Sequence, residues 1–331
     1  MEVLTQSRIA ANNWKMRVSD MASDNNLLYS FKAFAGINNI DPSFRLPQNV
    51  QNENFIGVIA DLATIENLDI DNAYSLKTRP GSVKKVDGSD MHSCWSNGDI
   101  CLFVDGPKLY LLMEDYSITE LKDGLVPGAH MVYQEVNDRV YMTNGSFIGY
   151  YKDMTVYDLQ QPTIPFKVVL PPGQRITYFQ GQLYIASGKV VYISDALCDH
   201  YDVRTGFRVF SGNISMMAAV DKGIYVADGK TWFMTRSPAL RVDEPDEFRR
   251  ESILDADAIP GTDVVFKGNK IKNGIEGNYL VWTSTEGICV GDSTGKILFQ
   301  TSDKYKLPSY AVGGAFLRDE NGVNHYITTL G

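Results

Sequence analysis

The 331-residue sequence predicts an all-β protein, a β-propeller of six or seven blades that follows an extended N-terminal arm. Three observations predict this fold: a hairpin pattern that recurs along the chain, the near-constant spacing of its copies, and a second pattern that follows two of them. Apolar residues flank a glycine-containing turn in each copy, as they do in antiparallel strands. We assign residues 1–50 to the arm and residues 51–331 to the propeller domain.

The recurring hairpin is clearest in RVYMTNGSFIGYY, residues 139–151, where apolar runs flank an Asn-Gly pair. Asn-Gly supplies the positive φ angles of a type I′ turn, which predicts such a turn at Asn144-Gly145. The five copies have glycines at positions 106, 145, 188, 229 and 287, with gaps of 39, 43, 41 and 58 residues. Four-stranded blades repeat at about 40–50 residues, so each hairpin is interpreted as part of one blade. The longest gap fits one blade with an insertion near KGNKIKNGIEGN.

A second repeated pattern supports the same register. The motif Ser-x-Ala-Leu occurs at residues 194–197 and again at residues 237–240, which is 43 residues later. It follows the hairpin, where a blade would continue to its outer strand. A β-sandwich or jelly roll remains the alternative architecture, because glycine turns occur in every class of all-β protein.

The two ends of the chain determine the predicted blade number. Residues 56–88 contain strand patterns around Pro80-Gly81 and could supply the first blade. Residues 309–330 predict two strands around Asn321-Gly322, one of which would close the propeller. Within the arm, residues 19–34 could hold a short helix, and residues 36–49 are expected to be extended. We expect the arm to become ordered on a neighbouring protein.

Composition excludes several classes of protein. The net charge is −9, and no run rich in Lys and Arg is present, which disfavours a surface that grips nucleic acid. No apolar run has the length of a membrane span, and the first 20 residues lack the apolar core of a signal peptide. The cysteines suit reduced thiols in the cytosol. Cys101 and Cys289 are expected to be buried in strands, and Cys94 could pair with Cys101, although nothing in the sequence requires it.

Few residues suggest a metal site. His200 lies beside Cys198, Asp199 and Asp202, which are suitable ligand types, but their spacing matches no known site. The other histidines, His92, His130 and His325, are far apart in the sequence, and His130 is expected to be packed in a strand. Asp69 and Asp71 faintly resemble a calcium loop, but Tyr74 stands where that loop needs glycine. No metal ligand is therefore assigned.

No catalytic motif stands out either. A pair of carboxylates could cleave sugars, as in some five-bladed propellers. The acidic candidates for such a pair are Asp195, Asp199, Asp243, Glu244, Asp246 and Glu247. Solvated acidic loops are the better interpretation, and no nucleophile, phosphate-binding or zinc-protease motif is present. We expect no enzymatic activity, no catalytic or cofactor-binding residue and no cofactor.

Four stretches carry a resemblance to a known family. They are FKAFAGINNIDPSFRLP, ATIENLDIDNAYSLKTRPG, MHSCWSNGDICLFVDGPKLYLL and RVYMTNGSFIGYY, together covering roughly residues 32–151. This part of the chain resembles tail-associated virion proteins of bacteriophages, whose members share a GINNID-like arm, an NLDID…LKTRPG-like segment, an HS.W step and a VY.TNG hairpin. The SDAL…YD and SPAL…DEF segments also resemble outer-strand loops of propellers in short-tailed phage nozzles.

The resemblance implies a structural protein of the virion tail, made in the cytoplasm of a host bacterium. It would be a subunit of a nozzle or hub ring through which DNA is ejected. Its implied partners are copies of itself, other tail proteins such as tube, adaptor or fibre, and DNA in transit without specific binding. A net charge of −9 suits a conduit, because an acidic surface repels phosphates. Two alternatives remain: a fibre-attachment or receptor-binding propeller, and a carbohydrate-processing propeller enzyme.

Overall fold

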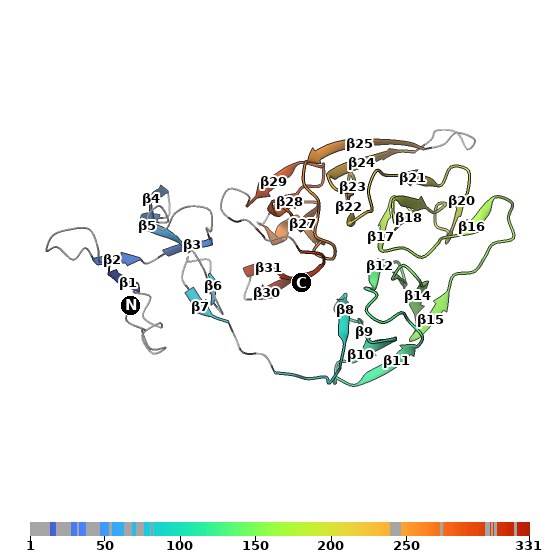
Figure 1. The fold of residues 1–331 in the computed structure, drawn as a ribbon, viewed down its shortest axis with the longest axis horizontal. Helices are drawn as coiled ribbons and strands as arrows, with labels where there is room; N and C mark the ends of the chain where they lie inside the picture. Colours follow the sequence, from blue (N-terminus) through green and yellow to red (C-terminus); the bar gives the residue numbers. More distant parts are fainter. Residues whose placement is uncertain are drawn as a thin grey trace. The chain divides into compact units, whose positions relative to one another are not determined.

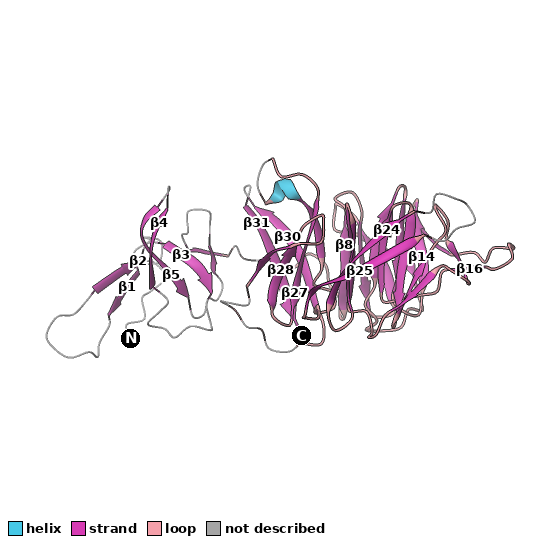
Figure 2. Ribbon diagram, turned by 90° about the horizontal axis from the view of Figure 1, so that it is seen from above, coloured by secondary structure: helices cyan, strands magenta, loops and turns pink. Residues whose placement is uncertain are grey.

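The computed structural model describes residues 14–17, 28–31, 33–37, 47–52, 55–62, 68–70, 76–79, 81, 83–238, 246–271, 274–301, 305, 307, 310–320 and 323–331. The chain divides into two compact units. The first comprises Met1–Ser82, Thr301–Leu307 and Arg318–His325, and the second comprises Val83–Gln300, Pro308–Leu317 and Tyr326–Gly331. Figure 2 shows strands as the dominant element, and the short 3-10 helix η3 (Gly268–Lys270) is the one helix among the described residues.

The second unit contains five four-stranded antiparallel sheets, which follow one another along the chain as the blades of a β-propeller (Figure 1). Blade 1 comprises β8 (Met91–Ser96), β9 (Cys101–Asp105), β10 (Lys108–Leu112) and β11 (Ile118–Lys122). Blade 2 comprises β12 (Val132–Val136), β13 (Arg139–Thr143), β14 (Ile148–Lys152) and β15 (Thr155–Asp158). Blade 3 comprises β17 (Arg175–Phe179), β18 (Gln182–Ser187), β19 (Val190–Ile193) and β21 (Phe207–Val209). Blade 4 comprises β22 (Met216–Val220), β23 (Gly223–Ala227), β24 (Thr231–Ser237) and β25 (Glu247–Leu254). Blade 5 comprises β26 (Val264–Lys267), β27 (Asn278–Ser284), β28 (Gly287–Gly291) and β29 (Ile297–Gln300).

The hydrophobic core of this unit lies between neighbouring blades. The first strands lie side by side, β12 with β17, β17 with β22, and β22 with β26. Every residue of β23 is buried, so this strand presents apolar side chains to the blades on both sides. Tyr225 of β23, for example, packs against Trp282 of blade 5 with 5.6 Å between ring centroids. Burial on both faces explains why the second strands are continuous apolar runs rather than alternating ones.

The five predicted hairpins are confirmed, because each one joins the second and third strands of a blade. All five glycines have positive φ angles, as the hairpin prediction required. The type I′ turn at Asn144-Gly145 is wrong, however. Thr143 pairs with Ile148, so the loop has four residues, and the Asn144 side chain accepts hydrogen bonds from the backbone nitrogens of Ser146 and Phe147. The short side chain of Asn144 therefore builds an Asx turn in place of the two-residue turn.

The predicted blade number is wrong, since five four-stranded sheets are present where six or seven blades were expected. The segment of residues 56–88 does not form a blade: β5 (Phe55–Leu62) pairs with β3 (Ala33–Ile37) and β4 (Pro47–Asn52), and β6 (Leu68–Ile70) pairs with β7 (Leu76–Thr78). The two C-terminal strands are confirmed as β30 (Gly313–Glu320) and β31 (Val323–Leu330). They pair with each other, and within the described residues neither joins a four-stranded sheet, so the expected closing strand is not found there.

The first unit also contains β1 (Trp14–Arg17) paired with β2 (Leu28–Phe31). The short helix predicted over residues 19–34 is wrong for Leu28–Phe31, which is a strand. Most of the remaining residues of that prediction lie outside the described ones. The strand β4 agrees with the extended conformation expected at residues 47–49. The assignment of residues 1–50 to an arm, and its ordering on a neighbouring protein, stay predictions.

Candidate functional site

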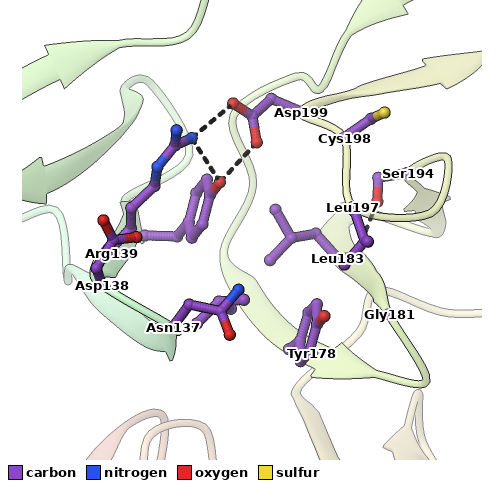
Figure 3. A pocket seen from close by; sticks show the side chains of 12 residues that line it. Asn137, Asp138, Arg139, Tyr178, Gly181, Leu183, Ser194, Leu197, Cys198 and Asp199 are labelled. Atoms are coloured by element: carbon purple, nitrogen blue, oxygen red, sulfur yellow. Dashed lines mark hydrogen bonds and ion pairs between the residues drawn. The ribbon is translucent and has the colours of Figure 1, made fainter.

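A cavity of about 190 Å³ lies where blades 2 and 3 meet. Three segments form it: the turn between β12 and β13, the turn between β17 and β18, and residues 194–199, which follow β19 (Figure 3). Its lining comprises Val136, Asn137, Asp138, Arg139, Tyr141, Tyr178, Gly181, Leu183, Ser194, Leu197, Cys198 and Asp199. The cavity therefore combines one strand-turn corner from each blade with a segment that leaves blade 3.

That segment belongs to an excursion between the third and fourth strands of blade 3. Its strand β20 (His200–Asp202) pairs with β16 (Lys167–Val169), which precedes the blade in the sequence. Leu197 has a φ of 58° and is 79% exposed, and its backbone nitrogen donates to the Gly181 carbonyl at 2.8 Å. The excursion is thereby held over the turn between β17 and β18, which places Asp199 in the cavity.

A charged network crosses the cavity between the two blades. The Tyr141 hydroxyl donates to Asp199 Oδ1 at 2.6 Å, and Arg139 Nη1 lies 3.4 Å from Oδ2 of the same carboxylate (Figure 3). Arg139 also donates to the Tyr141 oxygen at 3.3 Å, and its guanidinium lies 4.5 Å from the Tyr150 ring centroid. Burial, followed by the hydrogen bond to Asp199, raises the pKa of Tyr141. The phenol therefore remains a hydrogen-bond donor throughout the neutral range.

A second group of charges surrounds the excursion. Lys167 Nζ lies 2.7 Å from Asp195 and 3.3 Å from Asp202. His200 Nε2 lies 3.3 Å from Asp195, and Arg204 lies 2.7 Å from Asp202. The hydrogen bond from Arg204 holds the pKa of Asp202 well below its usual range, although burial acts in the opposite direction. Both carboxylates are therefore paired with cations, which fix the shape of the excursion.

The Asp and His side chains of residues 199–202, which the sequence suggested as metal ligands, lie near one another, but each one is engaged by another side chain. Asp199 binds Arg139, His200 lies against Asp195, and Asp202 binds Arg204. Within the described part of the chain, no group of three or more His, Cys, Asp or Glu side chains could hold a metal ion. In the first unit, Asp69 binds Arg79 at 2.7 Å and Arg318 at 2.6 Å, which leaves it poorly suited to calcium. Asp71 and Tyr74 lie outside the described residues.

The described acidic candidates for catalysis lie on two segments of the chain. Asp195 and Asp199 lie on the excursion, whereas Asp246 precedes β25 and accepts two 2.7 Å contacts from Arg236. Glu247 is an exposed residue at the start of β25. Asp243 and Glu244 lie outside the described residues, as do Ala239 and Leu240 of the repeated motif. Ser194 and Ser237 do occupy the predicted place, at the end of the third strand of blades 3 and 4.

Sequence reasoning missed the partners of these carboxylates. Arg139 and Tyr141 are two residues apart on β13, so they lie on the same face of the strand, which is a signal that the sequence contains. Their partner Asp199 is 60 residues away along the chain, and no local pattern connects it to them. The same limitation hides the contact between His92 and His130, whose ring centroids are 5.4 Å apart. Burial, followed by His130, lowers the pKa of His92.

Comparisons with known proteins find similar solved structures but no matching family. No protein-family model and no curated protein matches the sequence. Similar solved structures include a streptogramin B lyase, at 15% identity and a TM-score of 0.42 over 73% of this chain and 83% of that one. They also include the N-terminal domain of Nup159 (13% identity, TM-score 0.43, 72% of each chain). A third is the β-propeller domain of Cps50 (Swd1) from Myceliophteria thermophila (13% identity, TM-score 0.43, 76% of this chain and 86% of that one). These similarities carry no argument about function.

Proposed function

We propose that this chain is a non-enzymatic structural protein, a ring subunit in the nozzle or hub of a phage tail through which DNA is ejected. The resemblance of residues 32–151 to tail-associated virion proteins motivates the proposal. The proposal that the protein is not an enzyme rests on one observation: the charged groups around the cavity are paired with one another. These groups neutralise one another instead of presenting an unpaired acid or base.

The state of the carboxylates explains this reasoning. A general acid needs a carboxyl whose pKa is raised towards neutrality, and a general base needs an oxygen that is free to accept a proton. Asp199 accepts hydrogen bonds from Tyr141 and Arg139, and Asp202 has a lowered pKa. Asp202 therefore remains ionised near pH 7, and both carboxylates are bound to donors. This arrangement favours a role in holding blade 2 against blade 3.

The net charge of −9 agrees with a conduit for DNA. Duplex DNA carries one negative charge per about 1.7 Å of its axis. Basic side chains along the channel would therefore attract the phosphates at many points and slow the ejection of DNA. An acidic ring avoids that attraction.

The described part of the chain contains no helix that is long and apolar enough to cross a membrane.

The oligomeric state of the purified full-length chain tests the proposal. Sedimentation velocity and negative-stain electron microscopy should show a closed ring, alone or after addition of tail proteins from the same phage. A chain that stays monomeric in the presence of those tail proteins would contradict the ring. Turnover of bacterial surface polysaccharide that is lost in the Asp199→Asn variant would contradict the non-enzymatic part.

A fibre-attachment propeller is the second candidate, and exposed apolar side chains on blade 3 favour it. Phe207 and Val209 of β21, the outer strand of this blade, are 38% and 55% exposed. Apolar side chains that gather on an outer strand often mark a contact with another protein. If this edge binds a fibre, the double variant Phe207→Ser/Val209→Ser should lose fibre binding and keep its ring. The ring proposal without fibre attachment expects the parent chain itself to bind no fibre protein.

A further inference from the structure

Two cysteine thiols face each other inside blade 1. The Sγ atoms of Cys94 on β8 and Cys101 on β9 are 3.8 Å apart. Cys101 pairs with Ser96, two residues beyond Cys94, so the two cysteines are diagonal neighbours on one face of the sheet. Cys94 is exposed and Cys101 is half-buried, which leaves the pair within reach of a small reagent.

We propose that Cys94 and Cys101 form a dithiol site, which an oxidant of the disulfide class converts into an intramolecular disulfide. A disulfide needs the sulfur atoms to approach from 3.8 Å to about 2.05 Å, a movement that side-chain rotation and a small backbone shift can supply. The inference is independent of the proposed tail function.

The backbone of β8 can make that adjustment. The pairing of β8 with β9 changes register between His92 and Trp95, and Ser93 has a φ of 54°. An irregular strand tolerates a shift more easily than one held by an unbroken ladder. Among the described strands, β8 pairs only with β9, so movement of β8 breaks no second ladder.

The neighbourhood of the thiols determines how fast they react. Burial of the sulfur, followed by the adjacent Cys101 thiol, raises the pKa of Cys94 to about 11, although the residue as a whole is exposed. The thiolate is the attacking species, so oxidation is slow at neutral pH and faster in alkaline solution. The Tyr133 hydroxyl is buried, and burial, followed by the two cysteines, raises its pKa. The phenol therefore adds no negative charge beside the sulfurs.

The chemistry balances with oxidised glutathione as the oxidant. The Cys94 thiolate attacks one glutathione sulfur, forms a mixed disulfide and releases one glutathione thiolate. The Cys101 thiol then loses its proton, and its sulfur attacks the Cys94 sulfur and releases the second glutathione. Two protein thiols are oxidised, one glutathione disulfide is reduced to two thiols, and the two protons pass to the released glutathione.

Peptide mass spectrometry tests this reaction on the full-length chain. Trypsin leaves both cysteines in one peptide, residues 86–108, because Lys85 and Lys108 are the nearest cleavage sites. After oxidation at a pH of about 8.5, acid quenching and alkylation, we expect this peptide to be unalkylated and lighter by about 2 Da. The variant Cys101→Ser should instead carry glutathione or the alkyl group on Cys94. The Cys198→Ser variant, which lacks a cysteine on blade 3, should behave like the parent chain.

A second experiment tests whether the fold brings the two sulfurs together. It measures the equilibrium constant for oxidation of the Cys94–Cys101 pair by oxidised glutathione, first in the folded chain and then in the chain unfolded by urea. A larger constant in the folded chain supports the dithiol site, because the fold then brings the sulfurs together. An equal or smaller constant overturns it. A parent peptide that carries two alkyl groups or two glutathiones, or that is linked to Cys198, also overturns it.

Discussion

Removing the hydroxyl of Thr143 should weaken the connection between blades 2 and 3. Thr143 is fully buried, and its Oγ1 lies 2.8 Å from the Phe147 carbonyl and 2.9 Å from the Gly173 carbonyl. It also accepts a hydrogen bond from the Gly173 nitrogen at 2.9 Å. One hydroxyl has one proton, so it serves one carbonyl at a time while it satisfies the Gly173 N–H. Gly173 is buried and leads into β17, so these bonds join the central hairpin of blade 2 to blade 3.

The substitution Thr143→Val keeps the branched shape and leaves the buried Gly173 N–H without an acceptor. Such a loss costs about 1–3 kcal/mol of unfolding free energy. For a unit of this size, about 2 kcal/mol corresponds to a fall of about 4–8 °C in melting temperature. Urea unfolding should show a lower midpoint with an unchanged slope, because the surface exposed on unfolding is the same.

The control is Thr155→Val at an exposed position, where the hydroxyl makes one long contact of 3.4 Å with the Asp153 carbonyl. Its effect should stay within about 0.5 kcal/mol. If Thr143→Val is no more destabilising than this control, the account of the inter-blade hydrogen bonds is refuted.

Three further predictions concern charge, turns and chemistry. The pKa of Asp228 is lowered: burial raises it, but hydrogen bonds from Trp232, Gly212 and Ser211 outweigh that effect. Its contribution to stability is therefore present above the unfolded-state pKa of about 4 and lost as the pH falls through the folded-state value. Asp228→Asn should accordingly lower stability at pH 6 and flatten the decline measured by urea unfolding below pH 4. Gly229 has a φ of 102° with no neighbouring atom within 4 Å of an added Cβ, so Gly229→Val should cost about 1–3 kcal/mol from backbone strain alone. Gly188, with a φ of 58°, lies in the left-handed helical region and should cost less, and equal melting temperatures for both variants and the parent would count against the shared hairpin. Finally, purified protein should release no sugar from bacterial surface polysaccharide, and activity that disappears in Asp199→Asn or Asp246→Asn would establish a carbohydrate-processing enzyme.

The elements that the sequence predicted correctly are those that local chemistry determines. Glycines at positive φ and the apolar runs beside them marked all five central hairpins, because both signals lie within a few residues. Strand pairing over longer distances was not predictable in this way. The strand β5 has the same apolar character as a blade strand, yet it pairs with β3 and β4, which made the blade number wrong.

The candidate site shows the same division. The sequence indicated that Cys198, Asp199 and His200 lie in a polar segment after a blade strand, which the structure confirms. It did not show that β20 would pair with β16, or that Arg139 would reach Asp199 from another blade. Without those long-range contacts, a metal site and a set of ion pairs cannot be distinguished in the sequence, because both place carboxylates and an imidazole in one loop.

The most direct test of the central claim is an electron cryomicroscopy map of this chain in its assembled state. The account predicts a closed ring of identical subunits around a channel, with a neutral or acidic inner surface and with Lys and Arg mostly at subunit contacts or on the outside. A continuous belt of Lys and Arg along the channel would contradict a conduit through which DNA slides, because such a belt would hold the phosphates. A map without any ring or channel would contradict the ring itself and favour the fibre-attachment propeller.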